Sequence, residues 1–176
     1  SPSRGLGDVY KRQDMKFPKY NYFFKHGFFL YQPILPVENS IEGIEALLKI
    51  THKFGFFSVM SGIKAYRDQK EDFLLSFAQN GYSITMDIPK YPNKIKEQIK
   101  MFYEMNDCVI KYGGKIYLGK TSVLNKDHFF EMYKKLNSFQ SIKEKYDEYN
   151  IFESNMYRRI MQINSTGIIM PSIYSI

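Results

Sequence analysis

The stretch "GYSITMDIP", residues 81–89, decides the fold, because apolar and polar side chains alternate along it. The apolar side chains are those of Tyr82, Ile84, Met86 and Ile88, and the polar ones are those of Ser83, Thr85 and Asp87. Alternation with a period of two is typical of a strand that buries one face. We therefore predict a strand whose second face meets solvent or a partner.

Three further segments indicate strands. "FFLYQPILP", residues 28–36, is rich in aromatic and branched residues and ends at prolines, which stop a strand. The other two are "FFSVMSGIKAY", residues 56–66, and "KIYLG", residues 115–119. The sequence thus predicts four strands, and the strand at 81–89 is the third of them.

Two amphipathic segments between these strands indicate helices. In "ENSIEGIEALLKITHKFG", residues 38–55, Ser40 is the expected N-cap, and the apolar face holds Ile41, Ile44, Leu47, Leu48 and Thr51. "NKIKEQIKMFYEMNDCVIKYGG", residues 93–114, has its apolar face at Ile95, Ile99, Phe102, Met105 or Asn106, and Val109. The order β-α-β-β-α-β predicts an α+β domain of the ferredoxin-like split type, an antiparallel sheet with both helices on one face. Two shorter helices are expected within residues 125–136 and 139–149, and residues 150–160 follow them without an assigned element.

Composition fits one folded domain. The chain has 176 residues, of which 44% are apolar, and a net charge of +7. Its one cysteine, Cys108, excludes an internal disulfide and is expected to be a small core side chain. The three histidines are isolated, so no metal site is expected. No transmembrane segment is expected either, since no apolar run approaches the roughly 18 residues of a membrane span.

The domain boundaries follow from changes in pattern. Residues 1–13, "SPSRGLGDVYKRQ", have no periodicity and are expected to be an unstructured, adapter-derived scar. Residues 14–27 lead into the domain at 28–160, and residues 161–176 form a tail. If the first segment is a scar, the natural gene is expected to continue upstream.

The open face of the predicted sheet has two candidate uses. One is RNA, because the RRM shares this strand order, although residues 84 and 86 are Ile and Met where that motif needs aromatics. The other is a ligand pocket, because hydroxyl, amide and ammonium groups suit a polyhydroxylated or phosphorylated substrate. The residues expected to converge there are Gln32, Lys64, Ser83, Thr85 and Lys120.

A resemblance favours the pocket. "NGYSITMDIP" at 80–89, together with the run from "GGKIYLGKTS" at 113–122 to "NMYRRI" at 155–160, resembles the C-terminal end of FAD-linked oxidases of the vanillyl-alcohol-oxidase superfamily. Within it, the chain is most similar to the decaprenylphosphoryl-β-D-ribose oxidase and D-arabinono-1,4-lactone oxidase groups. The resemblance implies the C-terminal substrate domain of such an enzyme, with FAD bound mainly by an N-terminal domain that this chain lacks.

The same resemblance implies the chemistry and the site. A secondary alcohol of a sugar, a sugar lactone or a polyprenyl-phospho-sugar would lose a hydride to flavin N5. Lys120 would be the catalytic residue, with Gln32 and Tyr117 beside the cofactor and Gln32 and Lys64 at the substrate. The Asn and Cys of the family segment are Ser83 and Thr85 here, which leaves the exact substrate open. Arg158 and Arg159 would hold carboxylates or helix ends.

The resemblance also implies partners and a location. The isolated chain is expected to be inactive without its FAD domain. A partner reductase and a cytoplasmic site at the inner membrane surface would accompany a lipid-linked substrate, and no nucleic acid is expected. The alternatives are an RRM-like RNA-binding module and a plain α+β interaction domain.

Overall fold

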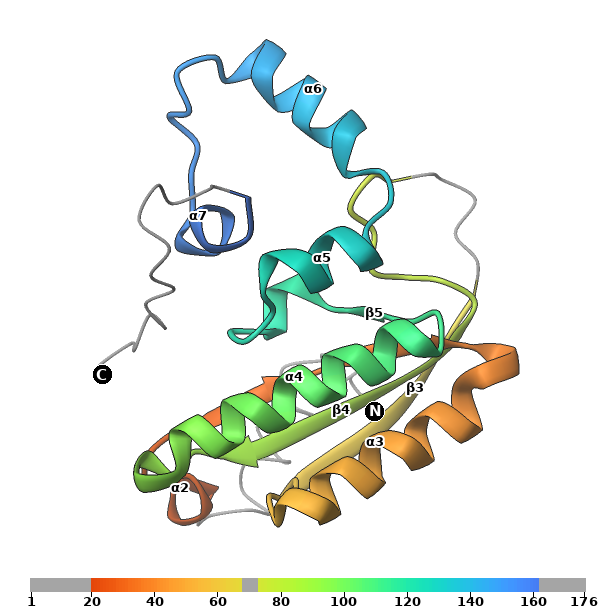
Figure 1. Ribbon diagram of the computed structural model, residues 1–176, viewed down its shortest axis with the longest axis vertical. Coiled ribbons are helices and arrows are strands. Elements are labelled where there is room, and N and C mark those ends of the chain that lie inside the picture. The colour runs from red at the N-terminus through yellow and green to blue at the C-terminus, as the bar shows by residue number, and fades with distance from the viewer. Residues whose placement is uncertain (1–19, 68–72, 162–176) are drawn as a thin grey trace, which may run out of the picture.

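An antiparallel sheet lies at the centre of the protein (Figure 1). The computed structural model describes residues 20–67 and 73–161. Its strands are β1 (Phe28–Tyr31), β2 (Pro33–Pro36), β3 (Met60–Tyr66), β4 (Gly81–Pro89) and β5 (Lys115–Ile116). The expected scar at 1–13 and all but the first residue of the tail at 161–176 lie outside the described residues.

β1 and β2 behave as one strand that is interrupted at Gln32. Both pair with β4 in a single register, with Tyr31 opposite Met86 and Ile34 opposite Ser83. That register puts Gln32 opposite Thr85. β3 pairs with the other edge of β4, and β5 pairs with β2, so the order across the sheet is β3, β4, β1 with β2, and β5. This is the strand order of a ferredoxin-like sheet, and the predicted fold class is confirmed.

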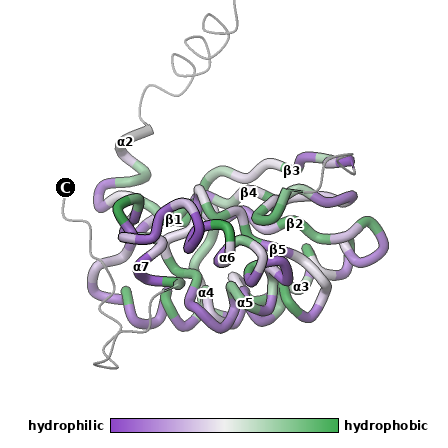
Figure 2. The backbone as a smooth tube through the Cα atoms, turned by 90° about the horizontal axis from the view of Figure 1, so that it is seen from above, coloured by the Kyte–Doolittle hydropathy of each residue, from purple (hydrophilic) through white to green (hydrophobic). Residues whose placement is uncertain are grey.

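Two long helices cover one face of the sheet. α3 (Ser40–Phe54) and α4 (Ile95–Lys111) run side by side in Figure 1, and Figure 2 shows them in a layer below the strands. The side chains that meet between the layers include Phe29, Tyr31, Leu35, Leu47, Ile84, Met86, Ile88, Met101, Phe102, Met105, Val109 and Ile116. The opposite side of the sheet, which α3 and α4 do not cover, is called the open face below.

The start of α3 differs from the prediction. Ser40 is the first helical residue rather than the N-cap, and its hydroxyl donates to the carbonyl of Val37 at 2.7 Å. A 3-10 helix, η1 (Val37–Asn39), precedes it, because the chain turns immediately after β2. Of the predicted apolar face, Leu47 is buried, but Ile41 is 77% exposed and lies beyond the edge of the sheet contact.

α4 carries a polar chain through the core. The hydroxyl of Tyr31 donates to Asn106 Oδ1 at 3.1 Å, and Asn106 Nδ2 lies 3.3 Å from His128 Nδ1. His128 Nδ1 must then accept, so its hydrogen is on Nε2, which donates to Asp107 at 2.9 Å. Burial raises the pKa of Tyr31 well above its usual value, so Tyr31 remains a donor. These hydrogen bonds fix the end of β1 against α4.

The fourth strand is shorter than predicted. Only Lys115 and Ile116 form β5, and the chain then turns through the 3-10 helix η3 (Leu118–Lys120). Gly119 permits this turn, because a side chain there would lie 3.1 Å from the Tyr117 ring. Cys108 is half-buried against the core, and burial raises the pKa of its thiol.

Short elements complete the described part. They are α2 (Tyr20–Phe23), η2 (Pro92–Lys94), α5 (Lys126–Met132), α6 (Leu136–Tyr146) and α7 (Asn155–Met161). Asn125 caps α5 by accepting from the His128 backbone N–H at 2.9 Å. The two predicted C-terminal helices therefore exist as α5 and α6, with α6 starting three residues early, and α7 is a further helix that the sequence did not predict. Across residues 20–67 and 73–161, no helix combines the length and apolar character that a membrane span needs.

Candidate functional site

A pocket of about 450 Å³ opens on the open face of the sheet. The residues that line it are Gln32, Lys64, Tyr66, Ser76, Phe77, Ala78, Tyr117 and Lys120. They come from the break between β1 and β2, from β3, from the segment before β4 and from the turn after β5. Segments that are distant in the sequence therefore meet at one concave site, which is the usual form of a small-molecule pocket.

The sheet itself positions one side of this pocket. The register places Gln32 beside Thr85 on one strand and Lys64 beside Ser83 on the next. Tyr117 continues the β5 pairing, since its backbone N–H donates to the carbonyl of Gln32 at 2.9 Å. Side chains directly opposite one another in an antiparallel pair share a face, so these residues all point to the open side.

The turn after β5 brings Lys120 to the rim. The Lys120 backbone N–H donates to the Tyr117 carbonyl at 3.1 Å and closes η3. Arg159, on α7, donates from its guanidinium to the carbonyl of Thr121 at 3.3 Å. Arg158 pairs with Glu153 at 3.1 Å. The two arginines thus hold a backbone carbonyl and a carboxylate within this chain, and Arg159 supports the turn that carries Lys120.

Sequence patterns did not indicate the third wall, residues 76–78. This segment has no periodicity and lies between the strands predicted at 56–66 and 81–89, where no element is predicted. In the fold, Phe77 packs between two pocket tyrosines, with ring centroids 5.7 Å from Tyr66 and 5.2 Å from Tyr117. Lys115 donates to the Ser76 carbonyl at 3.4 Å. The only sequence signal for this wall is a phenylalanine within a loop. Tyr66 was also missed, although its β3 neighbour Lys64 was identified.

The floor of the pocket contains polar atoms without partners. Gln32 is 2% exposed, and its Nε2 donates to Ser83 Oγ at 3.2 Å and to Tyr66 OH at 3.4 Å. Gln32 Oε1 and Thr85 Oγ1 are buried and have no hydrogen-bond partner among the described residues. Buried polar atoms without partners are costly, so a group that is absent from the chain would stabilise them.

The pocket is electropositive. Its lining contains Lys64 and Lys120 and no acidic residue. Within residues 20–67 and 73–161, neither ammonium group has an ion-pair or hydrogen-bond partner. Two unpaired cations beside a neutral polar floor favour a ligand that is anionic or electron-rich on one side.

The predicted site residues converge in part. Gln32, Lys64, Tyr117 and Lys120 line one pocket, as the interleaved strands imply. Ser83 and Thr85 lie in the sheet beneath that pocket rather than in its lining: Ser83 is fully buried and accepts from Gln32. In the part of the chain that the structure describes, no cluster of three potential metal ligands occurs.

Comparison with known proteins identifies the family. The sequence model of the D-arabinono-1,4-lactone oxidase family matches residues 11–160, well over half of the chain. The chain belongs to this family. It is also 27% identical over 135 residues to decaprenylphosphoryl-β-D-ribose oxidase from Mycolicibacterium smegmatis, a span that covers 76% of this chain and 28% of that relative. The predicted relationship to these oxidases is confirmed, and the chain spans less than a third of the length of this relative.

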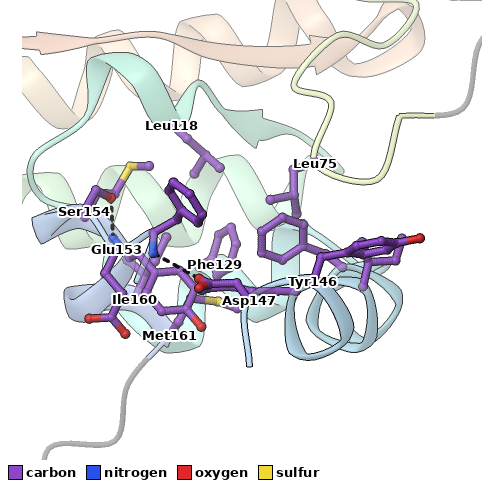
Figure 3. A pocket seen from close by; sticks show the side chains of 15 residues that line it. Leu75, Leu118, Phe129, Tyr146, Asp147, Glu153, Ser154, Ile160 and Met161 are labelled. Atoms are coloured by element: carbon purple, nitrogen blue, oxygen red, sulfur yellow. Dashed lines mark hydrogen bonds and ion pairs between the residues drawn. The ribbon is translucent and has the colours of Figure 1, made fainter. Parts of the chain in front are cut away.

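This member of the D-arabinono-1,4-lactone oxidase family has a second, larger cavity. It measures about 620 Å³, lies among α5, α6 and α7, and is mostly apolar (Figure 3). It adjoins the first pocket, because Leu75 and Leu118 line it while Ser76 and Tyr117 line the other. At its edge, Lys143 donates to Asp147, and Lys143 Nζ lies 4.8 Å from the centre of the Tyr157 ring.

Asp147 joins α6 to the segment that leads to α7. Its carboxylate accepts from Lys143 and from the backbone N–H groups of Ile151 and Phe152, at 2.7 and 3.1 Å. The hydrogen bond from Lys143 lowers the pKa of Asp147, the two backbone hydrogen bonds lower it further, and desolvation opposes them. The same hydrogen bond raises the pKa of Lys143.

We expect the α6–α7 connection to loosen in acid. The folded-state pKa of Asp147 lies below its unfolded value. The contribution of this carboxylate to stability is therefore complete above about pH 4 and is lost as pH falls through the folded pKa. Carbon-13 NMR of the Asp147 carboxyl and exchange of the Ile151 and Phe152 amides measure this. Asp147→Asn should remove the acid-dependent step. A carboxyl midpoint equal to that of an unstructured aspartate peptide would contradict the prediction.

Proposed function

We propose that this chain is the C-terminal, substrate-side domain of an FAD-dependent oxidoreductase that oxidises a secondary alcohol of a sugar or sugar lactone. The observation that carries the proposal is one pocket formed by Gln32, Lys64, Tyr117 and Lys120 in a chain of this oxidase family. The chain covers 28% of its relative, which is in keeping with a separate FAD-binding part.

The residues present fit a flavin on the open face. The pocket offers tyrosine rings, unpaired ammonium groups and the buried acceptor Gln32 Oε1, and the buried hydroxyl of Thr85 lies in the sheet beneath it. Gly62 stands opposite Thr85, and a side chain added there would meet nothing within 4 Å, so the sheet leaves room beside the pocket. When bound, FAD would accept the hydride from the alcohol carbon at its N5 atom. We propose that Gln32, Tyr117 and Lys120 hold its ring.

Each pocket residue then has a role. Lys120 would stabilise negative charge on an electron-rich ring edge, because a fixed cation in a partly dry site needs no reorganisation. Lys64 would bind a hydroxyl or phosphate oxygen of the substrate. Gln32 and Thr85 would accept hydrogen bonds from hydroxyl groups. The residues that line this pocket include no carboxylate or imidazole. We propose that the base for the hydroxyl proton comes from the FAD domain.

The substrate and partners follow from the same proposal. The name of the M. smegmatis relative describes a ribose attached to a decaprenyl phosphate. A sugar lactone and a polyprenyl-phospho-sugar are therefore the two substrate classes to test. A lipid-linked substrate would bring the enzyme to the cytoplasmic surface of a membrane, together with a partner reductase.

The open face argues against an RRM-like function. RRM sheets stack bases on aromatic side chains of the two central strands. Here the aromatic residue that the central strands present on the open face is Phe28, at the start of β1, and it packs against Phe24 with ring centroids 4.5 Å apart. This face of the central strands also carries Leu30, Gln32, Ile34, Ser83, Thr85 and Asp87. The nearby aromatic rings lie at the rim of the pocket, where Phe77 packs against Tyr66 and Tyr117. This arrangement favours a small ligand over a nucleic-acid strand.

The test is anaerobic mixing of the complete flavoprotein with each candidate substrate. We expect D-arabinono-1,4-lactone or a polyprenylphosphoryl ribose to bleach the flavin absorbance. The isolated chain of 176 residues is the control and should purify without colour and without turnover. An isolated chain that purified yellow, with flavin bound, would contradict the proposal that FAD is held mainly by another domain. A complete protein whose flavin no sugar, lactone or polyprenylphosphoryl sugar reduces would contradict the substrate class.

A further inference from the structure

The Gln32 side chain is held in one orientation by two hydroxyl groups. Ser83 Oγ and Tyr66 OH lie 3.2 and 3.4 Å from Gln32 Nε2, and no described group donates a hydrogen bond to Gln32 Oε1. An amide nitrogen has two hydrogens, so both are used. The oxygen is left as a buried acceptor in a residue that lines the pocket.

The opposite orientation of this amide is less favourable. If the amide were turned by 180°, its oxygen would accept from both hydroxyls, and the two N–H hydrogens would be buried without acceptors. Orphaned buried N–H groups are rarer in proteins than carbonyl oxygens without partners. The observed orientation leaves Gln32 Oε1 without a donor and the Ser83 hydroxyl hydrogen without an acceptor among the described residues, but it avoids two buried N–H groups without acceptors.

We propose that Tyr66 is a positioning residue that makes this pocket select a hydroxyl donor. Together with Ser83, it uses both amide hydrogens of Gln32 and thereby presents Oε1 to the ligand. Oε1 can accept from a ligand hydroxyl but repels a carbonyl or phosphate oxygen. This inference rests on the proposed function, since it assigns the group that the pocket recognises, and it concerns a residue outside the predicted site.

The surroundings of Tyr66 suit a positioning role. β3 is paired with β4 along its whole length, with Tyr66 opposite Gly81, which has no side chain to displace the ring. The ring meets Phe77 edge-on, at 88° between planes, so the hydroxyl is held at the end of a packed ring. Thr85 Oγ1, opposite Gln32 in the register, is a second buried oxygen without a partner on the same face, and as a hydroxyl it can accept or donate. The floor therefore offers the Gln32 Oε1 acceptor and the Thr85 hydroxyl, while Lys64 and Lys120 supply donors.

The orientation can be tested without a ligand. In nitrogen-15 NMR spectra of the chain, we expect both Gln32 side-chain N–H signals to be shifted downfield and protected from exchange. Tyr66→Phe keeps the ring contact with Phe77 but removes the acceptor, so one of the two signals should move upfield and exchange faster. Tyr82→Phe, on the other face of β4, is the matched control and should leave both signals unchanged. Unchanged Gln32 signals in Tyr66→Phe would overturn the inference.

Ligand selection is tested with D-arabinono-1,4-lactone and its monodeoxy analogues, titrated by NMR into the complete flavoprotein with its flavin chemically reduced, so that no turnover occurs. The analogue that lacks the hydroxyl bound by Gln32 should bind about tenfold more weakly than the lactone, because it leaves Oε1 without a donor. Tyr66→Phe should raise the dissociation constant of the lactone towards that of the analogue. It should leave the dissociation constant of the analogue unchanged. An equal loss for both would overturn the positioning role. Absence of any lactone binding, with the Gln32 signals behaving as expected, would instead overturn the proposed substrate class.

Discussion

Replacing Lys120 with methionine is expected to reduce the rate of flavin reduction by substrate about 100- to 1000-fold in the complete enzyme. Methionine keeps most of the length of the side chain but removes its charge. Lys120 lines the electropositive pocket and has no partner among the described residues, so its charge is available to a ligand. Losing it removes a fixed cation where negative charge collects during the reaction. The measurement is anaerobic stopped-flow spectroscopy of flavin bleaching.

A matched lysine separates this effect from a general loss of charge. Lys134 is exposed, pairs with Glu131 three residues away and lies outside the pocket. Lys134→Met should therefore leave the reduction rate within about twofold. Thermal unfolding of both variants should match the parent protein. If Lys120→Met bleached its flavin as fast as the parent, Lys120 would have no catalytic role.

Gly81→Ala is expected to destabilise the fold by about 3 kcal/mol or more. A β-carbon at Gly81 would lie 1.9 Å from the carbonyl oxygen of Leu35, and this oxygen belongs to the backbone of the paired strand. Backbone that is paired within a sheet cannot move aside cheaply, so β2 and β4 would separate at the end of β4 where Gly81 lies between Pro36 of β2 and Tyr66 of β3. Urea unfolding followed by circular dichroism measures the loss.

Gly62 supplies the control for this substitution. It lies on β3 next to the same central strand, but an added β-carbon there would meet nothing within 4 Å. Gly62→Ala should thus change stability by no more than about 1 kcal/mol, and in the stabilising direction, because alanine loses less backbone entropy on folding. Equal stabilities for the Gly81 and Gly62 variants would show that the close approach at Gly81 is not strained.

Much of the fold was predictable, because its signals are local. The alternation at 81–89 and the periodicity at 93–114 depend only on neighbours along the chain, and both elements formed where expected. Errors occurred at the ends of elements. Ser40 entered the helix instead of capping it, and β5 ended after Ile116. Those ends depend on turns made with other segments, which a sequence pattern does not record.

The candidate site was predictable only as a set of residues. Gln32, Lys64, Tyr117 and Lys120 were named from strand alternation and family resemblance, and they line one pocket. Phe77 and Tyr66 were not named, because one lies in an aperiodic loop and the other at the end of a strand. Their roles come from ring contacts and from a hydrogen bond that joins residues 34 positions apart in the chain.

The sequence by itself determined the order of the strands and helices and the face that each one buries, because local periodicity specifies both. It also determined the family, because the family is recognised from aligned residues. Only the tertiary structure decided how the pocket is built. The single register of β1 and β2 along β4 sets Gln32 between Ser83, Thr85 and Tyr66. The orientation of its amide, and with it the choice between a donor and an acceptor in the ligand, depends on contacts that exist only when three strands lie side by side.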